Sequence, residues 1–226
     1  MTLEIFPELE QGSPEWLAAR CGLLTASTIG RLITPKLQVA DNETSRGLTL
    51  TLAAERITGH VEYVHPTFDM QRGTDEEPIA RAVYAEHFGP VEEIGFLTCE
   101  FDGFTIGYSP DGLVGSDGLI EIKSRKPKAH LTAILENKPP AENMAQLMCG
   151  LLISGRQWID YVSFSGGLSL WVKRVYRDDA WFEAIYAAAA SFETNVTASV
   201  ATYHAATLGM PATERVEQFP EMEIQL

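Results

Sequence analysis

Apolar residues in the first quarter of the chain recur with the spacing of short helices. The segment 13–17, Ser-Pro-Glu-Trp-Leu, is typical of a helix start, with Ser13 as N-cap and proline at the first helical position. Apolar spacing predicts a second short helix over 29–33 and a third over 47–59. The polar run 34–46 between them predicts a loop.

The middle of the chain changes between helical and strand-like patterns. A helical pattern covers 76–89, with Pro78 in its first turn, where the missing N–H does no harm. A strongly apolar helix is expected over 142–154, and a final helix over 178–208. Strands are expected over 91–100, 104–109, 119–124, 157–165 and 168–176.

This order of elements predicts the α/β (α+β) class, with a central mixed β-sheet flanked by helices. The length of 226 residues is sufficient for one well-packed domain. We therefore expect a single domain over 1–226, with a core at about 70–176. The N-terminal helices over 13–59 and the C-terminal helix over 178–208 are additions to that core.

Composition at first argues against a nucleic-acid partner. The chain has 17 Lys and Arg against 31 Asp and Glu, a net charge of −14, whereas a basic surface is the usual sign of nucleic-acid binding. No apolar stretch reaches the length of a membrane span, and the N-terminus lacks a signal-peptide core, so we expect a cytosolic protein. Three widely spaced cysteines without a CxxC motif predict ordinary buried thiols: Cys21, Cys99 and Cys149.

The strongest chemical pattern is Asp111 followed by Glu121, Ile122 and Lys123. Glu121 and Lys123 are two positions apart on an expected strand, so both lie on the same face of the sheet. Asp111 follows the preceding strand, and adjacent strands are only about 4.8 Å apart, so the two carboxylates can converge. With the Ile122 carbonyl they form an oxygen-rich site suited to Mg²⁺ or Mn²⁺, beside a lysine able to hold a water. The alternative is an ordinary exposed strand, because Glu-x-Lys alone is a weak motif.

Two more residues are candidates for the same site. Glu77 belongs to an acidic group, 75–77, near the expected helix start, although acidic side chains there also complement the helix dipole. Gln146 falls within the apolar helix 142–154. It would reach the site if that helix packs on the sheet, and otherwise it would lie at the solvent edge.

Together these residues resemble the core of the PD-(D/E)xK restriction-endonuclease-like nucleases. Three segments, 10–27, 72–77 (Arg-Gly-Thr-Asp-Glu-Glu) and 109–113 (Ser-Pro-Asp-Gly-Leu), are also similar to successive motifs of the phage lambda exonuclease family of alkaline exonucleases. The resemblance extends in order over about residues 10–176, which makes it far more specific than Glu-x-Lys. It implies a restriction-endonuclease-like core with added N- and C-terminal helices.

The resemblance also implies an activity. Such an enzyme is a Mg²⁺-dependent exonuclease that degrades one strand of linear double-stranded DNA from the 5′ end and leaves 3′ single-stranded tails. It implies two Mg²⁺ ions, with Mn²⁺ as a substitute, and a homotrimer ring around the DNA. It further implies a phage-type single-strand annealing protein as partner in recombination, and a phage- or prophage-encoded protein in the bacterial cytoplasm.

Roles follow for individual residues by the same resemblance. The two metal ions would be held by Glu77, Asp111, Glu121 and the Ile122 carbonyl. Lys123 would position the attacking water, and Gln146 would orient that water or the phosphate. Two metals of this kind hold the attacking and leaving oxygens of an in-line displacement.

Further residues match the positions with which the family contacts DNA. The 5′-phosphate pocket would consist of Arg20, Ser27 and Ser109. Without the motif, Arg20 would be an ordinary surface arginine at a helix end, and Ser27 an N-cap. Met70 matches a hydrophobic wedge inserted between bases, unless it fills a gap in the core.

The distribution of charge removes the conflict with a DNA partner. Residues 62–121 carry thirteen acidic and two basic side chains, whereas 122–138 carry five basic and one acidic. Within this second segment Arg125, Lys126 and Lys128 are expected to contact DNA. Two Mg²⁺ ions would invert the charge of the ligand carboxylates. The remaining acids are expected to face outward, or to line the region through which the DNA slides.

Two other functions stay open at this point. A structure-specific or sequence-specific DNA endonuclease could use the same fold, and circular DNA would distinguish it from an exonuclease. A non-catalytic acidic interaction protein would tolerate the loss of Asp111, Glu121 and Lys123.

Overall fold

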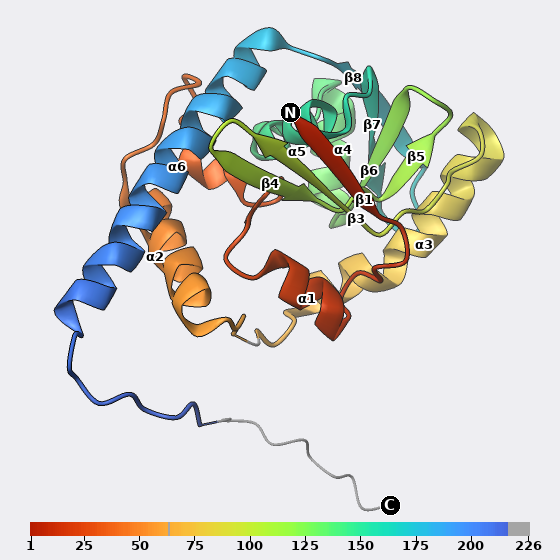
Figure 1. The fold of residues 1–226 in the computed structure, drawn as a ribbon. Coiled ribbons are helices and arrows are strands. Elements are labelled where there is room, and N and C mark those ends of the chain that lie inside the picture. Colours follow the sequence, from red (N-terminus) through yellow and green to blue (C-terminus); the bar gives the residue numbers. More distant parts are fainter. Residues whose placement is uncertain (63, 217–226) are drawn as a thin grey trace, which may run out of the picture.

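Six α-helices and eight strands make up the part of the chain that the computed structural model describes, residues 1–62 and 64–216 (Figure 1). The strands are β1 (Thr2–Phe6), β2 (Leu24–Thr25), β3 (Phe96–Phe101), β4 (Phe104–Tyr108), β5 (Gly112–Val114), β6 (Gly118–Ser124), β7 (Trp158–Phe164) and β8 (Trp171–Tyr176). The helices are α1 (Pro14–Arg20), the 3₁₀ helix η1 (Ile29–Leu32), α2 (Glu43–Thr58), α3 (Phe68–Phe88), α4 (Pro127–Glu136), α5 (Ala141–Ser154) and α6 (Asp179–Ala206).

The strands form two four-stranded sheets, in the orders β1-β3-β4-β2 and β5-β6-β7-β8. Both sheets are mixed, because β2 is parallel to β4 and β6 is parallel to β7, while the other pairs are antiparallel. The predicted α/β class is confirmed, although the strands divide between two sheets instead of sharing one. The chain passes from the first sheet to the second between β4 and β5, so the loop 109–111 lies at their junction.

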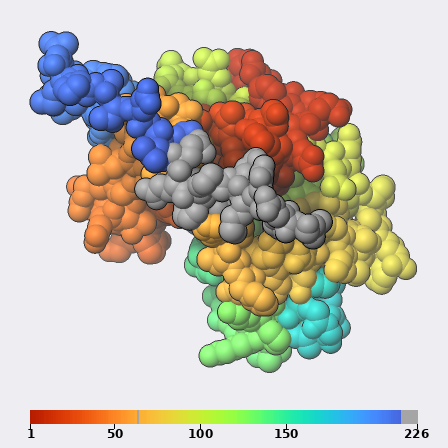
Figure 2. All heavy atoms as spheres, turned by 90° about the horizontal axis from the view of Figure 1, so that it is seen from below, coloured from red at the N-terminus to blue at the C-terminus, as the bar shows by residue number. Residues whose placement is uncertain are grey.

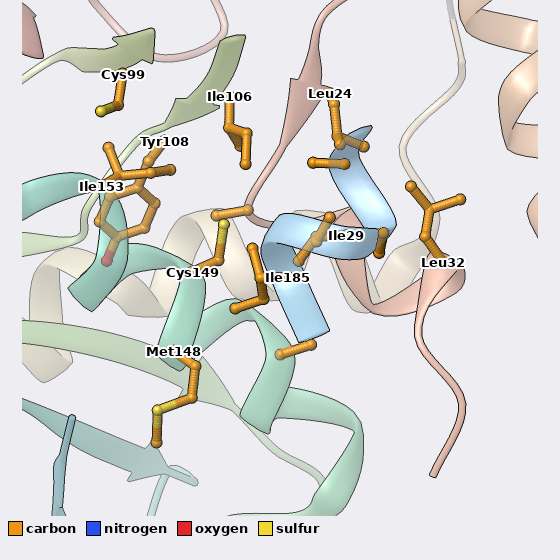
Figure 3. Close-up of a cluster of buried hydrophobic side chains, with 14 of the residues drawn as sticks. Leu24, Ile29, Leu32, Cys99, Ile106, Tyr108, Met148, Cys149, Ile153 and Ile185 are labelled. Carbon is orange, nitrogen blue, oxygen red and sulfur yellow. The ribbon is translucent and has the colours of Figure 1, made fainter. Parts of the chain in front are cut away.

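Helices pack on these sheets around two buried apolar clusters. The larger cluster draws on α2, α5, α6 and the first sheet, and includes Leu24, Ile106, Met148 and Ile185 (Figure 3). α2 and α6 run side by side next to it (Figure 1). In the smaller cluster, Tyr84 of α3 packs against apolar side chains of β6 and β7. Burial of these side chains fixes α3 beside the strand that carries the predicted catalytic residues.

Several local predictions are confirmed. Ser13 is the N-cap of α1, and its side chain accepts a 3.1 Å hydrogen bond from the Trp16 amide. Asp178 caps α6 in the same way. α2 ends at Gly59, whose φ of 65° is a left-handed conformation that glycine adopts without strain. All three cysteines are free thiols, and Cys99 and Cys149 are buried as predicted, whereas Cys21 is only partly buried.

Two helices begin earlier than predicted. α2 starts at Glu43, inside the segment expected to be a loop, because Asn42 and Ser45 form a capping box there. α3 starts at Phe68, because Thr67 acts as its N-cap and accepts a 3.2 Å hydrogen bond from the Met70 amide. Pro78 therefore lies inside the helix and not in its first turn. The acidic group 75–77 is also far from the N-terminus, so the helix-dipole explanation for it is wrong.

Four elements have no counterpart among those predicted, and one of them is the two-residue strand β2. β1 pairs with β3 although all five of its residues are exposed, so it lacks the alternation of a half-buried strand. β5 is only three residues long. α4 begins with Pro127 at its N-terminus and lies within the basic segment 122–138, where we expected only contacts to DNA.

The surface seen in Figure 2 is formed mainly by the N-terminal segment with α1 (red), α2 (orange) and α3 (yellow). Among the described residues, no helix combines the length and the hydropathy that a membrane span requires.

Candidate active site

Glu121 and Lys123 lie on the same face of β6, as their spacing predicts, and they interact directly. Lys123 Nζ donates a hydrogen bond to Glu121 Oε1 over 2.7 Å, and Glu121 is only 1% exposed. Gln146 of α5 donates through Nε2 to the same oxygen over 2.5 Å and accepts from Lys123 Nζ over 3.2 Å. α5 therefore turns Gln146 toward the site and not toward solvent.

Asp111 is held against β6 by a backbone hydrogen bond. Its Oδ2 atom accepts from the Ile122 amide over 2.6 Å. The next residue, Gly112, packs closely under Val91, since a Cβ there would lie 2.2 Å from Val91 Cγ1. The carboxylate at the junction of the two sheets is thereby fixed next to the strand that carries Glu121.

The three predicted carboxylates are electrostatically coupled. Burial raises the pKa of Asp111 well above its ordinary value, and the charges of Glu121 and Glu77 raise it further. Burial also raises the pKa of Glu77, although its ion-pair partner Arg81, one helical turn later, lowers it. Because these carboxylates repel one another in a partly buried site, a bound cation would stabilise their charged forms.

Lys123 keeps its positive charge in this environment. Burial by itself lowers the pKa of Lys123, but the carboxylates of Glu121 and Asp111 outweigh that effect, so the pKa is raised. The amine is therefore protonated at neutral and moderately alkaline pH. It can stabilise negative charge, but it is a poor proton acceptor.

The available oxygens fit a hard divalent cation. Glu121 Oε2 is buried without a hydrogen-bond partner, and carboxylate and carbonyl oxygens are the ligands that Mg²⁺ prefers. Across residues 1–62 and 64–216, however, no three His, Cys, Asp or Glu side chains are grouped closely enough to form a ready-made metal cage. Glu77 is instead paired with Arg81.

The predicted 5′-phosphate residues form a second cluster. The guanidinium of Arg20, at the end of α1, lies 4.0 Å from the ring centroid of Trp16. Trp16 Nε1 donates a 2.9 Å hydrogen bond to Ser109 Oγ, which joins α1 to the loop that carries Asp111. Ser27 is exposed and is not the N-cap of η1, since that residue is Thr28.

One cavity of about 460 Å³ connects the two clusters. Ten of the predicted site residues line it: Arg20, Ser27, Met70, Glu77, Ser109, Asp111, Glu121, Ile122, Lys123 and Gln146. These residues come from α1, α3, α5, β6 and the loops near β2 and β4. A ligand that fills the cavity would contact the carboxylate–lysine cluster and the arginine–serine cluster at once.

Met70 lies at the edge of this cavity, in the first turn of α3. Its side chain is 54% exposed, so it does not fill a gap in the core. Burial of apolar side chains is favourable, and an exposed methionine beside a polar cleft is available to contact a ligand.

The three predicted basic contacts do not line the cavity. Arg125 donates hydrogen bonds to Tyr161 Oη and to Asn143, so much of its guanidinium is engaged. Lys126 is exposed and pairs with Asp69 over 3.0 Å. Lys128 is exposed on α4.

Some residues at the site were not among the predicted ones. Arg81 binds Glu77 and also donates a 2.8 Å hydrogen bond to the Asp111 backbone carbonyl. Trp16 fixes Ser109, which is 93 positions away. The i,i+4 spacing of Glu77 and Arg81 on a helix is a signal that could have revealed the first of these contacts.

Solved structures that resemble this chain include exonucleases. The alkaline exonuclease LHK-Exo from Laribacter hongkongensis aligns with a TM-score of 0.78 at 33% identity, over 86% of this chain and 98% of that one. Its complex with dAMP aligns with a TM-score of 0.77 at the same identity and coverage. A phage-related exonuclease from Haemophilus somnus 129PT shares the fold at 13% identity and a TM-score of 0.57, over 80% of this chain and 96% of that one. The chain thus has the alkaline exonuclease fold, and its likeness to LHK-Exo supports the nuclease class.

The match to a protein-family model identifies the family within the nuclease class. The YqaJ-like viral recombinase domain matches residues 15–157, and the chain belongs to this family. The predicted resemblance to the phage lambda exonuclease family is therefore confirmed. No curated protein matches the chain. Membership of this family supports a nuclease role in recombination, with DNA as the substrate and a divalent metal as the general cofactor of such nucleases.

Proposed function

We propose that this protein is a Mg²⁺-dependent exonuclease that degrades one strand of linear double-stranded DNA in the 5′→3′ direction and leaves 3′ single-stranded tails. The observation that carries this proposal is the cavity that joins the carboxylate–lysine cluster to Arg20, Ser27 and Ser109. A terminal phosphate bound at the second cluster would present the first phosphodiester to the first cluster. The complex of LHK-Exo with dAMP supports a deoxynucleotide as ligand.

The metal ligands in this proposal are Glu77, Asp111, Glu121 and the Ile122 carbonyl, holding two Mg²⁺ ions that Mn²⁺ can replace. The buried, unpartnered Oε2 of Glu121 and the raised pKa of Asp111 support the presence of a cation there. When bound, the metal ions polarise the phosphate and lower the pKa of a coordinated water.

Lys123 and Gln146 have separate roles beside the metal ligands. Lys123 remains protonated, so it donates hydrogen bonds to a water or a phosphate oxygen and stabilises the negative charge that develops there. Gln146 holds Glu121 Oε1 through Nε2 and Lys123 through Oε1, and so keeps both side chains in position.

The end of the DNA is recognised at the arginine–serine cluster. Arg20 presents a planar fork of donors to the 5′-phosphate, and stacking on Trp16 holds that fork in one orientation. The hydroxyls of Ser27 and Ser109 add hydrogen bonds. Met70 acts as the wedge that separates the terminal bases.

The remaining assignments concern the rest of the DNA and the partners. Lys126, Lys128 and Arg125 contact the backbone beyond the cleft, and Arg125 would exchange part of its bonding to Tyr161, Glu142 and Asn143 for a phosphate. The family resemblance supports a homotrimer ring around the DNA and a phage-type single-strand annealing protein as partner. The mass of the protein in solution tests the ring, since a monomer at micromolar concentration contradicts it.

A comparison of two DNA substrates tests the activity. With Mg²⁺, linear duplex DNA carrying 5′-phosphates should lose nucleotides from its 5′ ends, whereas a covalently closed circle of the same sequence should stay intact. Cleavage of the circle would indicate an endonuclease instead. An intact linear duplex at neutral and alkaline pH would refute a nuclease function altogether.

A further inference from the structure

Two buried polar atoms lack a hydrogen bond among the described residues, the hydroxyl of Tyr108 and Oε2 of Glu121. Buried polar groups are normally paired, so each such atom needs an explanation. Tyr108 is the last residue of β4 and is 1% exposed. It does not belong to the metal, phosphate or DNA contacts described above.

The two atoms belong to the same site. Tyr108 and Glu121 both line the catalytic cavity. Burial raises the pKa of Tyr108 well above its ordinary value, and the carboxylates of Glu121 and Asp111 raise it further, so the hydroxyl lies within the field of both acids. It is therefore a neutral O–H donor, and the nearby unpartnered oxygen is an acceptor.

The packing of α5 makes room for this tyrosine. A Cβ at Gly150 would lie 2.7 Å from Cζ and 2.9 Å from Oη of Tyr108. Figure 3 shows the Tyr108 side chain beside α5, the helix that carries Cys149 and Ile153. The same helix carries Gln146, which holds the other oxygen of Glu121. One helix thus places a glycine behind the tyrosine ring and a glutamine on the carboxylate.

We propose that Tyr108 is a positioning residue for the metal site, which donates a hydrogen bond to Oε2 of Glu121. Gln146 and Lys123 fix Oε1, so a donor at Oε2 would fix the plane of the carboxylate. A carboxylate oxygen has two lone pairs, so the same Oε2 atom can accept this bond and still bind a cation. Donors behind metal ligands raise metal affinity by orienting those ligands. This inference rests on the proposed function.

The test is Tyr108→Phe, which removes only the hydroxyl. Mn²⁺ binding to the DNA-free protein, followed by electron paramagnetic resonance, should weaken by about tenfold or more. The Mg²⁺ concentration for half-maximal hydrolysis should rise by a similar factor, while kcat at saturating Mg²⁺ should change by less than about twofold. The matched control is Tyr84→Phe. Tyr84 is also a buried tyrosine, and its hydroxyl donates a 2.7 Å hydrogen bond to Asp160, away from the catalytic cavity. The metal affinity of this variant should equal that of the wild type.

A second variant keeps the test decisive if Tyr108→Phe folds poorly. Gly150→Ala retains the hydroxyl but forces the ring to move, so it should also weaken Mn²⁺ binding. If the wild type degrades DNA and a folded variant binds Mn²⁺ as tightly as the wild type does, the role of Tyr108 is overturned while the proposed function stands. A wild type that neither binds Mn²⁺ nor degrades DNA overturns the proposed function itself.

Discussion

Nζ of Lys123 lies 2.7 Å from Oε1 of Glu121, two positions earlier on β6. The amine is partly exposed to the cavity, whereas the carboxylate is buried beneath it. The pair therefore places a positive charge at the surface of the cleft and a negative charge behind it. This order suits a lysine that faces a phosphate and an acid that binds a metal.

Lys123→Met should lower kcat by about 10²–10³-fold, because it removes one preorganised donor for the charge that develops in the reaction. The change keeps the length of the side chain, and binding of linear duplex DNA should stay within a few-fold of wild type. Single-turnover degradation of a labelled duplex measures the effect. The matched control, Lys36→Met, removes an exposed lysine outside the cavity and should leave kcat unchanged. An equal loss in both variants would contradict the role of Lys123.

Stability should depend on pH through Asp111. Its pKa is raised above the ordinary 3.8, so the folded protein binds more protons than the unfolded chain between that value and the raised pKa. The free energy of unfolding should therefore fall as pH rises through this window. A divalent cation should restore it, with the largest rise in Tm at high pH.

Thermal melts from pH 4 to 9, with and without Mg²⁺, measure this effect. Asp111→Asn provides the control, because the amide oxygen can still accept from the Ile122 amide while the charge is lost. The variant should lose less stability with rising pH and gain less from Mg²⁺. The same pH profile in both proteins would exclude Asp111 as its source.

Arg20 should determine the preference for phosphorylated ends. Arg20→Ala should raise KM for a 5′-phosphorylated duplex by roughly 10–100-fold, the effect of losing hydrogen bonds between charged groups. KM for a 5′-hydroxyl duplex should change little. Arg31→Ala, at an exposed arginine of η1 that does not line the cavity, should alter neither value. Equal losses on both substrates would show that Arg20 only stabilises α1.

Local patterns predicted those parts of the fold that depend on neighbouring residues. The cap at Ser13 and the shared face of Glu121 and Lys123 follow from hydrogen bonds or spacing within a few positions. The start of α3 was missed because Pro78 resembles a first-turn proline when only its near neighbours are considered. The bond from Trp16 to Ser109 spans 93 positions, and only the packing of α1 on the first sheet creates it.

The cavity was likewise predicted only in part. Motif order indicated that Arg20 and Glu121 share a site, and both line the same cavity. The pairing of Arg125 with Asn143 could not be derived from a count of basic residues, because it depends on how α5 packs against β7. Charge along a chain gives the number of cations, whereas the fold determines which of them are free.

Met70→Ala should slow degradation of blunt duplex ends more than that of frayed ends. A wedge offsets the cost of unstacking the terminal bases, so its loss matters only where those bases are paired. Ile79→Ala is a matched control, because Ile79 lies on the same helix, is also 54% exposed and does not line the cavity. Initial rates on blunt ends and on ends with an unpaired 5′ nucleotide measure the difference. Equal slowing on both ends would contradict a wedge.

The excess acid outside the cleft should limit non-specific binding to DNA. Most of the acidic side chains between 62 and 121 are exposed: Glu62, Asp69, Asp75, Glu86, Glu92, Glu93, Glu100, Asp102 and Asp117. Removing exposed negative charge lowers the electrostatic repulsion between the protein and the phosphate backbone. Salt at 0.1 M screens this repulsion over about 10 Å. A triple variant, Glu86→Gln, Asp102→Asn and Asp117→Asn, should therefore bind a long closed duplex more tightly than wild type.

Anisotropy titrations of this variant in EDTA, at several salt concentrations, test the idea without cleavage. The gain should be largest at low salt, and the slope of log K against log salt should be steeper than for the wild type. Hydrolysis at phosphorylated ends should keep its kcat, since none of the three residues lines the cavity. An unchanged slope would mean that the outer acids do not face the DNA, and the net charge of −14 would then have no bearing on how the substrate is held.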